Sequence, residues 1–172
     1  MALSRRDFFL GSFLPVESAT AIYAATAVAT TDPTHHFLQR ISYGPRPNDL
    51  AHARQIGIEA YLEEQLNPDW IDDAAADGRL QNLPILNMDR HTLHRLNNGE
   101  YRTYRALIEG MITRAVHSKR QLLERMVEFW ADHFNISGDA YTQDMIVYQR
   151  EAIRANALGS FRDLLVATAK SP

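Results

Sequence analysis

The sequence contains no cysteine. This absence excludes disulfide bonds, thiol catalysis, iron–sulfur clusters and cysteine-ligated zinc. Several short catalytic signatures are also missing: the G-x-S-x-G elbow, the phosphate-binding glycine loop, the dinucleotide fingerprint and H-E-x-x-H. Repeats and low-complexity tracts are absent as well. The sequence therefore has no local motif that specifies a reaction, and the cofactor requirement stays unknown.

An excess of positive charge is missing too. The 172 residues include 18 Lys and Arg against 21 Asp and Glu, which gives a formal net charge of −3. A weakly acidic chain lacks the basic surface of a nucleic-acid binder, so we expect no nucleic-acid partner. Hydrophobic residues make up 45% of the chain, which is enough to supply the core of one domain.

The first 29 residues have the pattern of an export signal. A charged start precedes an apolar stretch over residues 8–29, and Ala27-Val28-Ala29 fits a cleavage site. The residues that resemble a twin-arginine signal are Ser4, Arg5, Arg6, Phe8 and Phe9. We therefore predict that residues 1–29 are a signal peptide bound by the twin-arginine export machinery. Residues 30–172 would then form the mature domain, in the periplasm or outside the cell.

Two other interpretations of residues 1–29 stay open. The segment could be the amphipathic N-terminus of a cytoplasmic protein. It could also be an uncleaved anchor, because residues 8–29 are about long enough to span a bilayer. Residues 30–172 contain no comparable apolar segment, so no stable membrane span is expected in the mature chain.

The rest of the chain shows helical periodicity without strand-length alternation, which predicts an all-α, irregular multi-helix domain. Its central hairpin is expected from helices over residues 101–117 and 119–134. The apolar stripe of the first helix contains Tyr104, Leu107, Ile108, Met111, Ile112 and Ala115. Ser118 and Gln121 have the spacing of a capping box, which predicts that the serine caps the second helix and the glutamine reaches back.

The most informative polar cluster lies at the end of the second hairpin helix. Its members are Trp130, Asp132, His133 and Asn135. A histidine beside aromatic side chains and a carboxylate could serve as a general base or a metal ligand. The alternative, which we favour, is structural: His133 packs on the apolar face and bonds a backbone carbonyl, while Asn135 ends the helix.

His91 and His94 are weak candidates for metal ligands. His91 and His94 are three residues apart, so they would share one helix face, where Asp89 could complete the ligand set. Their neighbours are polar, and solvent exposure explains the pattern as well, so no metal site is predicted. A basic run between Arg102 and Arg125 is interrupted by glutamates, which favours a salt-bridged helix surface over an anion-binding one.

Several blocks of the sequence resemble one large bacterial family. Residues 37–47 resemble its opening, residues 57–68 its next block, and residues 120–135 give the best match, which continues over 153–172. The family is the domain of unknown function DUF1800. Asp132 stands where its members usually have asparagine. Members are usually much longer, so the resemblance implies an N-terminal, truncated portion with exposed apolar helix faces. The family is commonly exported and has no established activity.

Two hypotheses for function follow. The first is a non-enzymatic binding or assembly module that acts with a protein partner in the cell envelope, and the missing catalytic signatures support it. The second is an exported hydrolase or metal-dependent enzyme, whose site would combine His133 with residues outside this chain.

Overall fold

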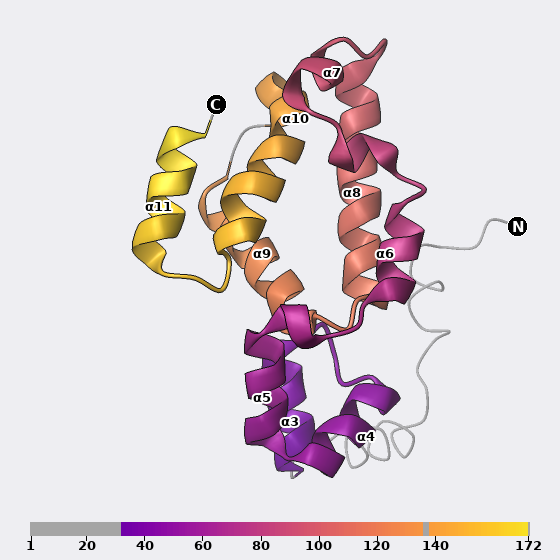
Figure 1. Cartoon of the computed structure of the whole chain (residues 1–172), viewed down its shortest axis with the longest axis vertical. Helices are drawn as coiled ribbons and strands as arrows, with labels where there is room; N and C mark the ends of the chain where they lie inside the picture. The colour runs from indigo at the N-terminus through magenta and orange to yellow at the C-terminus, as the bar shows by residue number, and fades with distance from the viewer. Residues whose placement is uncertain (1–31, 136–137, 172) are drawn as a thin grey trace, which may run out of the picture.

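The computed structural model describes residues 32–135 and 138–171, and all regular elements in these ranges are helical (Figure 1). The predicted all-α fold is confirmed for this part of the chain. The predicted signal peptide, residues 1–29, lies outside the described residues. None of the described helices has both the length and the apolar character that a membrane crossing requires.

The elements follow one another with short connections. The α-helices are α3 (Pro33–Ile41), α4 (Pro47–Ile56), α5 (Ile58–Leu66), α6 (Ala74–Leu80), α7 (Arg90–His94), α8 (Gly99–His117), α9 (Gln121–His133), α10 (Gly138–Val147) and α11 (Phe161–Lys170). Two 3₁₀ turns, η1 (Pro68–Trp70) and η2 (Pro84–Asn87), flank α6. The π-helical stretch η3 (Tyr148–Arg154) directly continues α10.

Helices α3, α4 and α5 form a small unit at one end of the molecule (Figure 1). The Asp32 side chain accepts a 3.0 Å hydrogen bond from the backbone N–H of Thr34 and so caps α3, as the sequence predicts. Gly57, at φ +89°, separates α4 from α5 and allows the sharp reversal between them. The apolar core of this unit is small and consists of Leu38, Ala53 and Tyr61.

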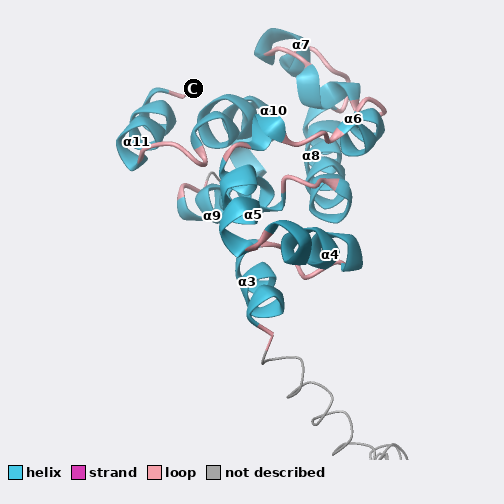
Figure 2. Ribbon diagram, turned by 60° about the horizontal axis from the view of Figure 1, so that its bottom comes forward, coloured by secondary structure: helices cyan, strands magenta, loops and turns pink. Residues whose placement is uncertain are grey.

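The remaining helices form a bundle with two apolar cores. The first core lies between α8 and α10 and contains Leu86, Leu93, Ala106, Leu107, Ile146 and Val147. The second lies between α9, η3 and α11 and contains Val127, Tyr148, Ala152, Ile153, Ala157 and Leu164. Helices α8 and α11 therefore lie on opposite sides of α10, as both views show (Figures 1 and 2).

Helix α8 turns a different face to the bundle than its periodicity suggests. The buried residues of α8 are Gly99, Thr103, Ala106, Leu107 and Gly110. Small side chains on this face allow η2 to approach closely, because a Cβ on Gly110 would lie only 2.7 Å from Cδ1 of Leu86. Most of the predicted stripe therefore faces outward: Tyr104, Ile108 and Ile112 are 47%, 38% and 59% exposed.

The capping box predicted for the hairpin turn does not form. Helix α9 begins at Gln121 rather than at Lys119, and the Ser118 hydroxyl accepts a 3.0 Å hydrogen bond from the backbone N–H of Arg120. The Gln121 side chain donates to the carbonyl oxygens of Ala115 and Ser118 at 3.1 and 2.8 Å. The prediction failed because both side chains are buried and committed to tertiary partners, which outweigh the local capping preference.

Candidate functional site

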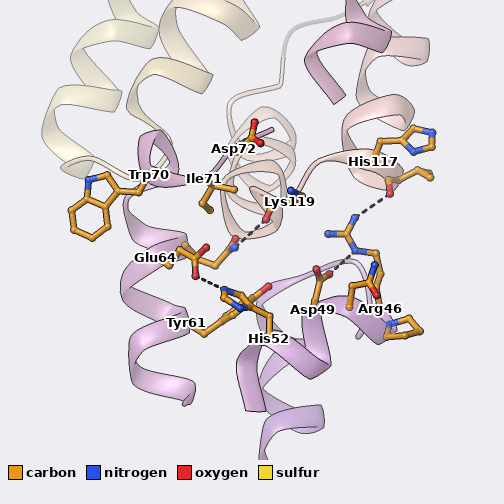
Figure 3. A pocket seen from close by; sticks show the side chains of 14 residues that line it. Arg46, Asp49, His52, Tyr61, Glu64, Trp70, Ile71, Asp72, His117 and Lys119 are labelled. Carbon is orange, nitrogen blue, oxygen red and sulfur yellow. Dashed lines mark hydrogen bonds and ion pairs between the residues drawn. The ribbon is translucent and has the colours of Figure 1, made fainter. Parts of the chain in front are cut away.

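A large cleft lies where α4, α5 and η1 meet the turn between α8 and α9 (Figure 3). Its volume is about 720 Å³. The cleft therefore lies between the α3–α5 unit and the bundle. Boundaries between packed units are common positions for ligand sites.

One ion pair and one histidine–carboxylate contact line the cleft on the side of the α3–α5 unit. The Arg46 Nε lies 2.5 Å from a carboxylate oxygen of Asp49, one helical turn away. The His52 Nε2 lies 2.7 Å from a carboxylate oxygen of Glu64 and joins α4 to α5 across the reversal at Gly57. The pairs place donors and acceptors in the cleft with little net charge (Figure 3).

An aromatic wall and an aromatic rim complete the cleft. Tyr61 forms part of the wall and is 2% exposed, and its burial raises the pKa of the hydroxyl to about 12. Trp70, in the turn η1, is 69% exposed and lies at the rim (Figure 3). Asp72 and Lys119 also line the cleft, and neither has an ion-pair partner among the described residues.

Hydrogen bonds to the hairpin turn fix the two sides of the cleft relative to each other. The Gln65 side chain donates to the carbonyl oxygen of Lys119 at 3.0 Å and accepts from the backbone N–H of Leu122 at 3.1 Å. The Asp73 carboxylate accepts from the Ser118 hydroxyl at 2.6 Å and from the backbone N–H of Lys119 at 2.7 Å. The junction between the α3–α5 unit and the bundle is therefore held by hydrogen bonds rather than by apolar packing.

The polar cluster predicted on α9 lies outside this cleft. The Trp130 indole N–H donates to the carbonyl oxygen of Ala157 at 3.0 Å and anchors the loop before α11. His133 is exposed, and its ring is stacked on Phe129 with an interplanar angle of 11°. Asp132 and Asn135 are also exposed. His133 is therefore held by contacts with neighbouring aromatic rings. Among the described residues, no carboxylate lies within hydrogen-bond distance of its ring.

The histidines on α7 are separated by their contacts. Asp89 caps the helix by accepting a 3.0 Å hydrogen bond from the backbone N–H of Thr92. His94 instead lies 2.9 Å from the carboxylate of Asp144 on α10, which also pairs with Arg90 at 2.6 Å. His91 is exposed. Across residues 32–135 and 138–171, no three His, Asp or Glu side chains are placed to hold a metal ion together.

A second surface feature is the outer face of α8. Its large apolar side chains follow the helical repeat from one end of the helix to the other and are all more than a third exposed. They are Tyr101, Tyr104, Ile108, Met111, Ile112 and Val116. We call this surface the α8 face. It contains a shallow groove of about 390 Å³, edged by Arg105 and Glu109.

The comparison with protein families agrees with the resemblance found in the sequence. A family model described as "Protein of unknown function (DUF1800)" matches residues 36–172. The chain belongs to the DUF1800 family. No curated protein and no solved structure matches it. The description of DUF1800 assigns no activity, so the family leaves both the cleft and the α8 face unassigned.

Sequence reasoning on this DUF1800 chain missed the residues that the fold brings into the cleft. The adjacent glutamates at positions 63 and 64 look like a solvated helix face in the sequence, and Trp70 lies in a region without clear periodicity. The one usable signal was the pairing of His52 with Glu64, because two helices joined at Gly57 must pack as an antiparallel pair. The other contacts depend on the junction with the hairpin turn, which no local pattern reveals.

Proposed function

We propose that this protein is an exported binding or assembly module of the bacterial cell envelope, and that the α8 face docks a protein partner. The observation that carries the proposal is the exposure of that face. Tyr101, Ile112 and Val116 are 67%, 59% and 55% exposed, and they belong to one continuous stripe. A soluble domain rarely leaves a contiguous apolar surface uncovered unless that surface binds something.

The shape of the α8 face indicates the class of partner. An exposed apolar stripe along a 19-residue helix fits an amphipathic helix laid beside it, which would bury its own apolar face in the groove. Arg105 and Glu109 lie along one edge of the groove and can pair with charges of either sign on the partner. The face thus combines an apolar centre with a charged edge, which is the usual anatomy of a protein interface.

The location of the proposed function depends on residues 1–29. Arg5 and Arg6, with the flanking serine and phenylalanines, support export through the twin-arginine route. The alternative, an exported hydrolase or metal-dependent enzyme built around His133, has less support. The described contacts of His133 are with the rings of Phe129, Trp130 and Phe134, which explain its position without a reaction.

Export is tested by changing both arginines to lysine and fractionating the cells. We expect the unchanged protein to appear outside the cytoplasm in a shortened form. The Arg5→Lys, Arg6→Lys variant should stay in the cytoplasm at full length. An unchanged distribution of the variant would contradict the export hypothesis, whatever the outcome for the α8 face.

Docking is tested by placing a photo-crosslinking amino acid at Ile112, and at Arg102 on the same helix as a control. Arg102 is also exposed but lies beyond the stripe. We expect one envelope protein to crosslink at position 112 only. The same crosslink should disappear in a chain that also carries Ile108→Glu. Equal crosslinking at both positions, or a crosslink at 112 only to a later segment of the same polypeptide, would refute a partner protein.

A further inference from the structure

The cleft at the polar junction has the size and the composition of a ligand site. Its volume of about 720 Å³ falls within the range of about 300–1,000 Å³ that small-molecule sites occupy. Its walls come from both sides of the junction: Tyr61 and Glu64 from the α3–α5 unit, and His117 and Lys119 from the bundle. A ligand in the cleft would therefore contact both units at once (Figure 3).

The charges in the cleft nearly cancel. Arg46 and Lys119 are positive, and Asp49, Glu64 and Asp72 are negative. With neutral histidines, two positive and three negative groups leave a formal net charge of −1. A strongly anionic or cationic ligand would gain little net attraction from such a lining. A neutral ligand with many hydroxyl groups would gain more, because carboxylates accept several hydrogen bonds and guanidinium and ammonium groups donate several.

Trp70 supplies an apolar platform at the rim. Its side chain is 69% exposed, although tryptophan, a large side chain, usually buries much of its surface. Pro68 and the hydrogen bond from the Trp70 N–H to the carbonyl oxygen of Asn67 hold the backbone of η1 in place. The negative face of an indole ring attracts the weakly positive C–H groups of a sugar ring. The platform thus lies at the edge of a cleft whose lining also offers hydrogen-bonding groups, which suits a ring with one apolar face and a polar edge.

Tyr61 adds a donor to the cleft wall. No described residue accepts a hydrogen bond from its hydroxyl, and the hydroxyl oxygen is accessible to solvent although the residue as a whole is 2% exposed. A tyrosine hydroxyl is protonated at neutral pH even without a shift, and burial raises the pKa of Tyr61 further, to about 12, so its proton is available for donation. A hydroxyl oxygen of a ligand would satisfy this donor.

From these observations we propose that the cleft binds a neutral saccharide, with Trp70 against one face of the ring and the Glu64 and Tyr61 side chains bonded to its hydroxyls. The cleft adjoins the α8 face at Val116, but Trp70 and Glu64, which carry this proposal, do not belong to that face. The two proposals can therefore fail independently.

The test uses calorimetric titration of the full chain with three neutral trisaccharides: cellotriose, maltotriose and triacetylchitotriose. We expect saturable binding of at least one of them, and an affinity that changes little when the salt concentration rises from about 0.05 to 0.5 M, because no net charge is engaged. Absence of saturable binding by all three would overturn the proposal. So would preferential binding of inorganic phosphate, used as an anionic probe, at the same cleft.

Matched variants locate the binding. Trp70→Ala removes the platform and should weaken the affinity at least tenfold, while Tyr101→Ala, which removes an equally exposed aromatic side chain from the α8 face, should leave it unchanged. Glu64→Gln keeps the shape and a hydrogen-bonding group but removes the charge, and should weaken binding severalfold. Unaltered circular dichroism shows that each variant is folded. Full affinity in folded Trp70→Ala would overturn the assignment to this cleft.

Discussion

The junction and the bundle are held together by different forces. The bundle is stabilised by apolar contact: Ile153 and Leu164 are 0% and 1% exposed in a core shared by α9, η3 and α11. The junction with the α3–α5 unit is stabilised by hydrogen bonds instead, and no buried apolar cluster of the described residues contains side chains from both sides. Gln65 and Gln121, 2% and 1% exposed, make the central bonds.

This difference explains where the candidate sites lie. Apolar packing is non-directional and fills space, so a core such as that of the bundle tends to close around its own side chains. Hydrogen bonds are directional and fix two surfaces at a few points. The junction can therefore be ordered and still leave the cleft open beside Gln65 and Lys119. The same difference predicts which mutations lower the free energy of unfolding most: those in the apolar bundle first, then those at the hydrogen-bonded junction.

The largest effect is expected in the bundle. Ile153→Ala should lower the free energy of unfolding by about 3–4 kcal/mol, because it removes buried methyl groups and leaves a cavity. Ile112→Ala on the α8 face is the matched control and should change it by less than about 0.5 kcal/mol. Urea unfolding followed by circular dichroism measures both. Equal losses would mean that the α8 face is covered within the chain.

A smaller effect is expected at the junction. Gln121→Ala should lower the free energy of unfolding by about 2 kcal/mol, because the backbone N–H of Tyr43 and the carbonyl of Ser118 lose a buried partner. Gln39→Ala, at an exposed position of α3, serves as the control and should have no measurable effect. A loss as large as that of Ile153→Ala would show that the junction is not the weaker of the two regions.

The smallest effect concerns Asp144, which joins α10 to α7. The hydrogen bonds from Arg90, together with His94, lower the pKa of the Asp144 carboxyl below its usual value. The stability that ionised Asp144 adds to the fold is therefore fully present above the pKa of the unfolded state and is lost as the pH falls through the lower pKa of the folded state. Asp144→Asn should lower stability by about 0.5–1 kcal/mol at pH 7, since the side chains of both Arg90 and His94 are about half exposed.

The pH dependence gives this prediction its test. Urea unfolding of the two proteins should differ at pH 7 and coincide once the pH is low enough to protonate Asp144 in the folded state. A difference that persists unchanged at low pH would show that the aspartate acts through shape or hydrogen bonding and not through its charge.

The sequence predicts the local elements well. The sequence predicts a helix over residues 48–56 that stops at Gly57 and another over residues 58–66, and both agree with the structure, because start and stop signals act within a few residues. The helix predicted from Asp144 to Ala157 begins earlier, at Gly138, and changes to π-helix at Tyr148. That change has no signature in the local pattern.

Tertiary relations were harder to predict. The orientation of α8 was missed because periodicity identifies an apolar stripe but does not say that small residues such as Ala106 and Gly110 form the packed face. The cleft was missed because Trp70 and Lys119 are 49 positions apart and meet only when Gln65 and Asp73 bind the hairpin turn. The functions predicted for His133 and for residues 1–29 stay predictions.

The hydrogen-bonded turn at Ser118 and Lys119 has a consequence for motion. The α3–α5 unit can swing away only when the bonds from Gln65, Tyr43 and Arg46 break together, so this opening is the expected route for solvent exchange of the amides of those helices. A molecule that contacts both walls of the cleft would be released by the same opening. Amide exchange in α5 would then slow in proportion to the occupancy of the cleft, so that a local protection factor would report binding without a label.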